Sequence, residues 1–299
     1  SSFGVLEDTD FILIQRGDEM YSLNPSLLPA FVPSLTFNLD STGLGSSDRA
    51  ISLEWSGARA PGQFKPQIQF PDSPNRDTYY FGASGSTWFV PSQLGSGTSR
   101  AVIYGAFDYI NFKNSNATVS LEQSQPGAFA AMVPTPAADF GRNMFSQNPK
   151  LTTVPLDIPL KSLGSIFEDC IVFNQDVSTF VTTGVINFRS VFEGCTAFNQ
   201  DVSSWDVASA TDMGRIFMDC SSYNKTINAW GPQLGNVITF QSAFRGCSAF
   251  NQPLNQWDVS GVRTLSPNAP GMDDMFKGTT VFDRDLSGWC VTEIPTEPF

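Results

Sequence analysis

A pattern of aromatic and polar residues occurs five times between residues 167 and 289, and it limits the possible folds more than any other feature. Each copy opens with a phenylalanine. At fixed distances it is followed by cysteine, a second aromatic residue, asparagine, an aliphatic residue and tryptophan, with substitutions in two of the copies. Successive opening phenylalanines stand 25, 25, 27 and 32 residues apart, and the extra length always follows the tryptophan position. The unit therefore has a fixed half and a variable half.

This division predicts a solenoid in which each copy forms one coil. The fixed positions form an inner wall where equivalent side chains stack, because one coil alone cannot bury its apolar face. We expect a short strand around Val202 and Trp205, a helical or 3₁₀ turn over 213–217, and a ladder of asparagine amides that bond the backbone of the adjacent coil. The predicted structural ladder consists of Phe167, Phe192, Phe217, Phe244, Phe276, Cys170, Cys195, Cys220 and Cys247.

The segments FEGCTAFNQDVSSWDV (192–207) and FRGCSAFNQPLNQWDV (244–259) resemble the BspA-like leucine-rich repeats, also described as the mycoplasma-type lipoprotein repeat. The last segment, LSGWCVTEIPTEPF (286–299), is similar to the closing segment of that family. The chain departs from the pattern at 224–226, which reads Asn-Lys-Thr, and at Thr279, which replaces a cysteine. The resemblance implies a curved, right-handed solenoid that serves as a binding or spacer module, without catalytic activity.

Residues 31–133 contain short alternating segments that Gly, Ser, Pro and Asp interrupt every 10–15 residues or so, which is typical of an all-β sandwich. Prolines between 134 and 159 exclude a long helix there, and Met144-Phe145 with later apolar residues indicates a degenerate first coil. The segments 109–112 and 118–121 could already form a coil edge. The fold class is therefore predicted as mainly β. A β-sandwich-like domain (31–133) precedes a transition and N-terminal cap (134–166), and a leucine-rich-repeat-type β/3₁₀ solenoid with a C-terminal cap (167–299) follows.

Residues 1–30 are predicted to form an N-terminal anchoring arm. The stretch TDFILIQRGDEMYSL (9–23) has two short apolar segments around a polar turn, and such a hairpin is too small to fold alone. It resembles the opening of cyanophage virion structural proteins, while an ordinary N-terminal hairpin is the alternative. The first ten residues lack a hydrophobic signal core, so we expect no Sec export unless a leader was removed before Ser1.

Composition narrows the possible functions. The chain has 299 residues, with 17 Lys and Arg against 29 Asp and Glu, which gives a net charge of −12. That balance disfavours nucleic acid and anionic membranes as partners, and no apolar run approaches the roughly 20 residues of a membrane span. The absence of histidine excludes Ser-His-Asp and Cys-His catalysis and histidine metal sites. We therefore predict a protein that is not an enzyme and has no cofactor.

Four candidate sites have simpler structural explanations. The cysteines lack paired Cys-x-x-Cys elbows, so small buried side chains are favoured over a zinc site. The aspartates lack a calcium-loop pattern and are expected at solvated coil edges. The tryptophans are expected in the core, with a sugar-binding stripe as the alternative. Nothing groups two acids for glycoside hydrolysis.

One variable segment is much longer than the others. Nineteen residues separate Trp257 from Phe276, against 12 in the shortest copies. Its inserted part, 261–271, holds two prolines and two glycines, and insertions in solenoids tend to collect on the binding face. We predict a surface protrusion with an interaction role, whereas a tolerated insertion without a partner is the alternative. The candidate interaction residues are Val262, Arg263, Thr264, Leu265 and Asn268.

The resemblance of the arm implies a virion structural protein of a phage, specifically a cyanophage, and the repeats and composition are consistent with a protein of that kind. The arm would bind other virion proteins, and the rest would project as a fibre, baseplate or head-surface component that aids assembly or contacts the host surface. We expect an oligomer within a particle assembled in the host cytoplasm, with no nucleic-acid binding and no membrane insertion. The alternative is a BspA-type bacterial surface adhesin on the cell surface.

Overall fold

The computed structural model describes residues 12–16, 19–23, 34–42, 44, 51–56, 58, 66–72, 78–82, 84–89, 97–124, 128–134, 136–263 and 271–289. Over these residues the chain is mainly β with little helix, which confirms the predicted class at that level. The strands are β1 (Ile12–Arg16), β2 (Glu19–Leu23), β3 (Ser34–Asp40), β4 (Ile51–Ser56), β5 (Gln67–Gln69), β6 (Thr78–Tyr80), β7 (Ser84–Phe89), β8 (Thr98–Tyr104), β9 (Tyr109–Asn111) and β10 (Thr118–Gln123). The helices are α1 (Ala128–Met132) and the 3₁₀ helix η3 (Asn228–Asn236).

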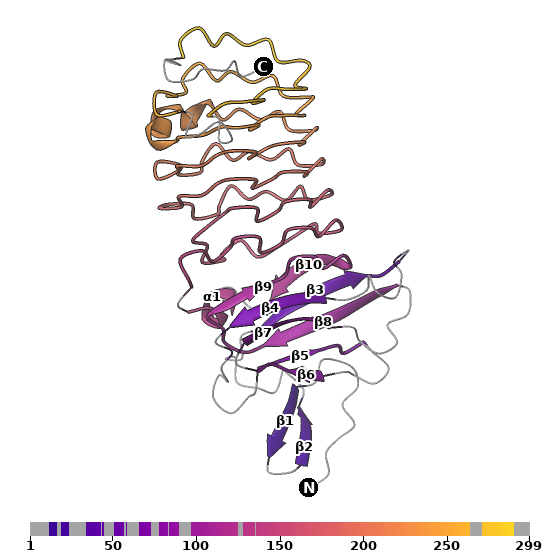
Figure 1. The fold of residues 1–299 in the computed structure, drawn as a ribbon. Coiled ribbons are helices and arrows are strands. Elements are labelled where there is room, and N and C mark those ends of the chain that lie inside the picture. Colours follow the sequence, from indigo (N-terminus) through magenta and orange to yellow (C-terminus); the bar gives the residue numbers. More distant parts are fainter. Residues whose placement is uncertain are drawn as a thin grey trace.

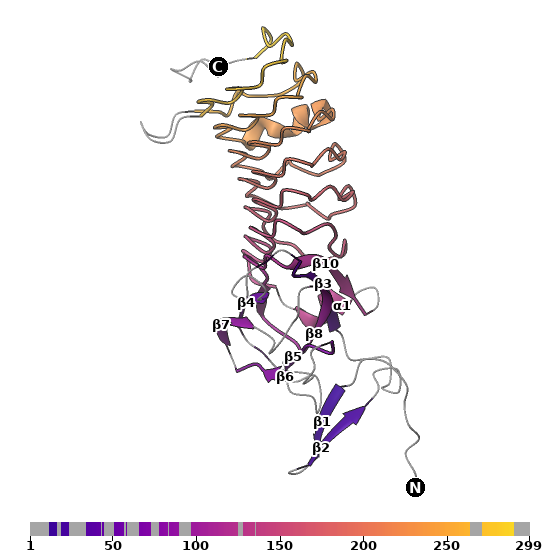
Figure 2. The same ribbon diagram turned by 90° about the vertical axis from the view of Figure 1, so that its right-hand side faces the viewer.

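The strands form three antiparallel sheets. A two-stranded sheet, β1-β2, corresponds to the hairpin predicted within 9–23, and it pairs Ile12 with Leu23 and Arg16 with Glu19. The other two are a five-stranded sheet in the order β10-β3-β8-β5-β6 and a three-stranded sheet in the order β7-β4-β9. We refer to these two sheets together as the sheet body. Figures 1 and 2 place the hairpin beyond β6, at the end of the body opposite β9 and β10.

The period-two pattern of β3 explains how the larger sheet faces the core. Leu35, Phe37 and Leu39 are buried, while Thr36 and Asn38 between them are half-buried, because successive strand residues point to opposite faces. Asn38 donates from its amide to Ser120 Oγ at 2.8 Å and to Glu122 Oε1 at 2.7 Å on the neighbouring β10. One face of the sheet is thus apolar, and the other is held by polar cross-strand pairs.

Trp55 on β4 fixes the packing of the smaller sheet. Its indole N–H donates to the Gly82 carbonyl at 3.1 Å, and its ring lies 4.8 Å from that of Phe81. Its cross-strand partner on β7 is Gly85, where an added Cβ would lie 2.7 Å from Trp55 Cζ2. A side chain at residue 85 would therefore displace the tryptophan.

The rest of the chain is a stack of coils in which alternate backbone groups bond successive coils. In the middle coil, the N–H groups of Met213, Arg215 and Phe217 donate to the carbonyls of Thr239, Gln241 and Ala243 at 2.8–3.1 Å. Between them, the Ile216 N–H closes a turn within the coil by donating to the Met213 carbonyl at 3.4 Å, and the Gly214 N–H donates to Asp212 Oδ1 at 2.9 Å. Arg215 reaches this geometry with a left-handed φ of 56°. We refer to the coils over 136–263 and 271–289 as the coil stack (Figure 1).

The expected strand around Val202 and Trp205 is wrong. The backbone there closes a turn, with the Trp205 N–H donating to the Val202 carbonyl at 3.1 Å. Bonding between coils is concentrated instead on the segments that carry the opening phenylalanines. The helix-like turn expected over 213–217 is present as a series of turns over 214–219. Apolar spacing located the turn, but it could not show that alternate N–H groups in it point to the next coil.

β9 and β10 form the layer of the sheet body on which the coil stack begins, at the segments 109–112 and 118–121 where a coil edge was expected. Phe112 N–H donates to the Met144 carbonyl at 2.8 Å, and Leu121 N–H to the Thr153 carbonyl at 2.9 Å. The Phe112 ring then stacks on Phe145 at 5.9 Å, and Phe145 stacks on Phe167 at 5.7 Å. Buried apolar side chains of body and stack consequently form one continuous core. The predicted domain boundaries stay a prediction.

Candidate functional site

The opening phenylalanines form a column of parallel rings along the stack. Successive ring centroids from Phe167 to Phe276 lie 5.6–5.8 Å apart, with interplanar angles of 5–20°. All five side chains are at most 3 % exposed. The predicted phenylalanine ladder is confirmed, and these residues lie in the core, away from any surface site.

The cysteines form a second column, and their thiols are donors as well as packing groups. Cys170, Cys195, Cys220 and Cys247 are free and fully buried, as predicted for the cysteine ladder. Each Sγ donates to the carbonyl of the opening phenylalanine of the preceding coil. The distances are 3.0 Å to Phe145, 2.9 Å to Phe167, 2.8 Å to Phe192 and 2.7 Å to Phe217. The thiols thus link neighbouring coils by hydrogen bonds.

Two other residues that occupy the cysteine position of their coils show that the hydrogen-bond donor is the property these coils share. Thr279 Oγ1 donates to the Phe244 carbonyl at 2.7 Å, and Asn148 Nδ2 donates to the Phe112 carbonyl at 3.0 Å. Sequence reasoning treated the cysteines only as small apolar groups and missed this role. The signal was Thr279, because threonine and cysteine share a short side chain with a hydrogen-bond donor.

The environment of the thiols suppresses their reactivity. Burial raises the pKa of Cys170 to about 12, and burial raises the pKa of Cys195, Cys220 and Cys247 well above the ordinary thiol value. Nucleophilic attack and metal binding require the thiolate, which this column disfavours. Among the described residues, no three His, Cys, Asp or Glu side chains gather to hold a metal ion.

The tryptophan column is buried, so it offers no stripe for sugar binding. Trp205, Trp230, Trp257 and Trp289 are at most 9 % exposed. Each indole N–H donates, at 2.9–3.2 Å, to the carbonyl of the aliphatic repeat position in the preceding coil, such as Val202 for Trp230. The core interpretation of this column is confirmed.

The asparagines form the predicted ladder on an outer edge of the stack. Asn174 Oδ1 accepts from the Asn199 N–H at 2.9 Å, and Asn199 and Asn224 do the same for the next coils at 3.0 Å. Several aspartates cap local turns rather than facing one another. Asp201 Oδ1, for example, accepts from the Ser203 N–H at 2.8 Å. Hydrogen bonds from Ser178 lower the pKa of Asp176, and equivalent bonds act on Asp258 and Asp285.

The predicted interaction loop needs a correction at its first residue. The Val262 side chain is only 2 % exposed and belongs to the core, because its N–H still closes a turn with the Val259 carbonyl at 3.1 Å. Arg263 is exposed, and its N–H donates to the Ile238 carbonyl at 3.2 Å. Thr264, Leu265 and Asn268 lie outside the described residues, so the predicted protrusion stays a prediction for them.

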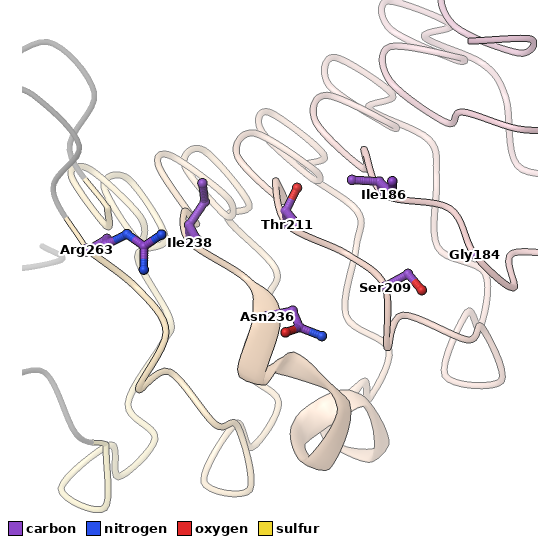
Figure 3. Close-up of a pocket in the computed structure, with 7 residues that line it drawn as sticks. All are labelled: Gly184, Ile186, Ser209, Thr211, Asn236, Ile238 and Arg263. Atoms are coloured by element: carbon purple, nitrogen blue, oxygen red, sulfur yellow. The ribbon is translucent and has the colours of Figure 1, made fainter. Parts of the chain in front are cut away.

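In each coil, the variable segment after the tryptophan position leads back to the next opening phenylalanine, and we call this segment the return leg. An open groove crosses the return legs of four coils and includes Arg263 (Figure 3). Its volume is about 630 Å³. One row of lining residues comes from successive coils, with Ile186, Thr211, Ile238 and Arg263 side by side, and a second row consists of Gly184, Ser209 and Asn236. A smaller depression of about 380 Å³ shares Gly184 and Ile186 and extends to Lys161, Arg142 and Asp139. We call these two connected depressions the return-leg groove.

The floor and the two ends of the return-leg groove differ in chemistry. In the floor, Thr211 N–H donates to the Ile186 carbonyl and Ile238 N–H donates to the Thr211 carbonyl, both at 2.9 Å, so these backbone groups are already paired. Ile186 is 57 % exposed, which leaves its methyl groups open to solvent. Cationic side chains stand at both ends, and the sequence had pointed only to Arg263. The others were missed because residues from different coils form the groove.

Similarity to known proteins is confined to the coil region. Residues 158–236 and 231–296 each match the family described as "Mycoplasma protein of unknown function, DUF285", which is related to BspA-like repeats. The matched part is less than half of the chain and lies in its C-terminal half. No curated protein and no solved structure is significantly similar to the chain. In the part of the chain that the structure describes, no helix is long and apolar enough to cross a membrane.

Proposed function

We propose that the chain is a non-enzymatic structural and interaction protein, built as a β-sandwich-like body that carries a leucine-rich-repeat-type solenoid. The observation that carries this proposal is the unbroken series of bonded coils on one continuous core. Such an arrangement holds surfaces at fixed distances along an axis, which suits spacing and binding. The aromatic rings and thiols of the columns are buried where no substrate reaches them.

We place this protein in a phage particle, as a fibre, baseplate or head-surface component. The β1–β2 hairpin supports this location, because it lies at one end of the body while the coils project from the other (Figures 1 and 2). In this arrangement the hairpin contacts other virion proteins and the coils face outward, toward the host surface. The alternative is a BspA-type surface adhesin, which the coil-region match to a mycoplasma family favours.

The location of the protein, in phage particles or in the cell envelope, distinguishes the virion proposal from the adhesin alternative. Phage particles and cell envelopes are purified from cultures that carry the gene, and the chain is quantified in each by mass spectrometry. The virion proposal expects a fixed number of copies per particle and a loss of incorporation when residues 1–30 are deleted. A chain without residues 290–299, which keeps the buried Trp289, is the truncation control and should still be incorporated. Recovery from the envelope of uninfected cells would support the adhesin instead.

A further inference from the structure

The return-leg groove combines features that suit one kind of ligand. Lys161, Ile186, Thr211 and Ile238 each stand six residues before an opening phenylalanine, and Arg263 continues their row through its backbone bond to Ile238. The row therefore reads cation, apolar, hydroxyl, apolar, cation along five successive coils. Arg142 and Asp139 add one charge of each sign beside Lys161, so that end stays cationic.

Charge separates this row from the rest of the molecule. The chain carries a net charge of −12, yet both ends of the row are cationic. A partner with negative charges at two matching points would be drawn to the groove and repelled by most of the remaining surface. The apolar side chains between the ends favour apolar groups in the middle of the partner.

The geometry of the row sets the length of that partner. Neighbouring bridged segments lie about 4.8 Å apart, so four steps from Lys161 to Arg263 span about 19 Å. An extended peptide advances about 3.3 Å per residue, so two acidic residues about six positions apart match the two ends. In an extended chain the residues at alternate positions share one face, which lets two apolar side chains reach Ile186 and Ile238.

We propose that the return-leg groove binds an extended peptide segment of a partner protein, with acidic residues at its two ends and apolar residues between them. This proposal rests on the interaction role proposed above and specifies its partner. Side chains must provide the recognition, because the bonds between coils already pair backbone groups of the floor. A peptide is favoured over a polysaccharide because the residues described as lining the groove include no aromatic ring on which a sugar could stack.

Binding of a labelled heptapeptide to the full chain tests the proposal. The probe has glutamate at positions one and seven, valine at three and five, and threonine elsewhere, and fluorescence anisotropy reports its binding. We expect saturable binding that weakens with salt, at least a fivefold loss in Lys161→Glu and in Arg263→Glu, and a larger loss in the double variant. Lys225→Glu, an exposed lysine outside the groove, makes the same charge change and should alter binding less than twofold.

A charge swap makes the test specific. A heptapeptide with lysine at both ends should fail to bind the unaltered chain and should bind the double variant. Circular dichroism checks that each variant is folded, and all three substituted side chains are exposed. No saturable binding at millimolar protein, or an equal loss in Lys225→Glu, would overturn the proposal. So would preferential binding of an acidic oligosaccharide such as oligogalacturonate. A failure here leaves the particle measurement above unaffected, so the two proposals can fail separately.

Discussion

The sheet body and the coil stack share one core but fill it in different ways. In the body, each buried residue has its own surroundings. Phe37 faces Ala101 across the ladder and meets the Phe112 ring at 61°. In the stack, the same surroundings recur, so that Phe192 and Phe217 each lie between two parallel rings at nearly equal distances. The body therefore depends on contacts that occur once, whereas a change in one coil affects the same contact on both sides.

Polar groups show the same contrast. Buried side-chain atoms without a hydrogen-bond partner in the described part of the body include Gln67 Oε1, Gln69 Nε2 and Thr118 Oγ1. In the described part of the stack, the thiol, indole and asparagine columns bond from coil to coil, and the unpartnered buried atoms, Glu193 Oε2, Arg215 Nε and the Tyr223 hydroxyl, lie outside those three columns. In the columns, the same hydrogen bond satisfies the buried polar group of every coil, whereas each buried polar group of the body needs a partner of its own.

A rise in pH should distinguish the stability of the coil stack from that of the sheet body more strongly than any of the substitutions below. The four buried thiols have folded pKa values above the unfolded value near 8.5, so their stabilising effect is complete below that pH and declines as pH rises toward the folded values. Each thiol should lose about 1.4 kcal/mol per pH unit in this window, or roughly 5 kcal/mol for four. Urea unfolding at pH 7.5 and 9.5 measures the loss.

Body tyrosines are a useful comparison for this pH effect. Burial also raises the pKa of Tyr80 and Tyr109, but tyrosine ordinarily titrates near pH 10, so the body should respond at higher pH than the stack. Replacing Cys220 with threonine should remove about one quarter of the effect. Equal stability at pH 7.5 and 9.5 would show that the thiols are accessible in the folded chain.

Phe217→Ala should be the most damaging single substitution in the middle coil. The ring is fully buried between Phe192 and Phe244, and its removal leaves a cavity that stacked neighbours cannot fill. We expect a loss of about 3–5 kcal/mol in the free energy of unfolding. Denaturant melts give the value, with the exposed Val181→Ala as control. A loss below about 1 kcal/mol would mean that the coils do not share their core as described.

A matched pair at Cys220 should isolate the thiol hydrogen bond. Valine and threonine have nearly the same shape, but only threonine can donate to the Phe192 carbonyl as Cys220 does. We expect Cys220→Val to be less stable than Cys220→Thr by about 1 kcal/mol. Thermal and urea unfolding of both variants test this difference. If valine proved equal or better, packing alone would account for the column.

Tyr223→Phe should give the smallest effect, with the opposite sign. The Tyr223 hydroxyl is buried without a hydrogen-bond partner, and its equivalents are phenylalanines such as Phe198 and Phe250. Removing it should leave stability unchanged or raise it by up to about 1 kcal/mol, because no bond is lost and a desolvated group disappears. Phe198→Tyr is the reverse control and should destabilise. A clear loss in Tyr223→Phe would reveal a partner for the hydroxyl.

The sequence predicted the columns well because each position had five independent copies. The asparagine ladder followed from the residue type, since a short amide at a turn bonds nearby backbone. The hydrogen-bonding role of the cysteines was hidden because thiols also pack as small apolar groups, and only the replacements at this position, Thr279 and Asn148, reveal the donor. The body offered no repeat, so neither its strand pairing nor the contact of Trp55 with Gly85 could be predicted from spacing.

The candidate site was harder to predict than the core. A length count from Trp257 to Phe276 detects an insertion but not where the chain leaves the stack, and Val262 still belongs to the core. The groove is assembled from side chains that are about 25 residues apart in sequence, such as Ile186 and Thr211. Its pattern of charge and apolar groups becomes visible only when the coils are placed side by side.

The backbone bonds between coils in the phenylalanine segments have one direction. N–H groups of an earlier coil donate to carbonyls of the later one, as from Phe167 to Val191 and from Phe192 to Ile216. In these segments every internal coil therefore has a donor edge and an acceptor edge that fit any other copy, and the groove floor repeats the opposite direction, as from Thr211 to Ile186. A tandem duplication of one unit could insert between two coils without disturbing either joint, and would shift everything beyond it by about 4.8 Å. The reach of such a molecule can thus evolve by gene duplication alone, while both ends keep their own surfaces.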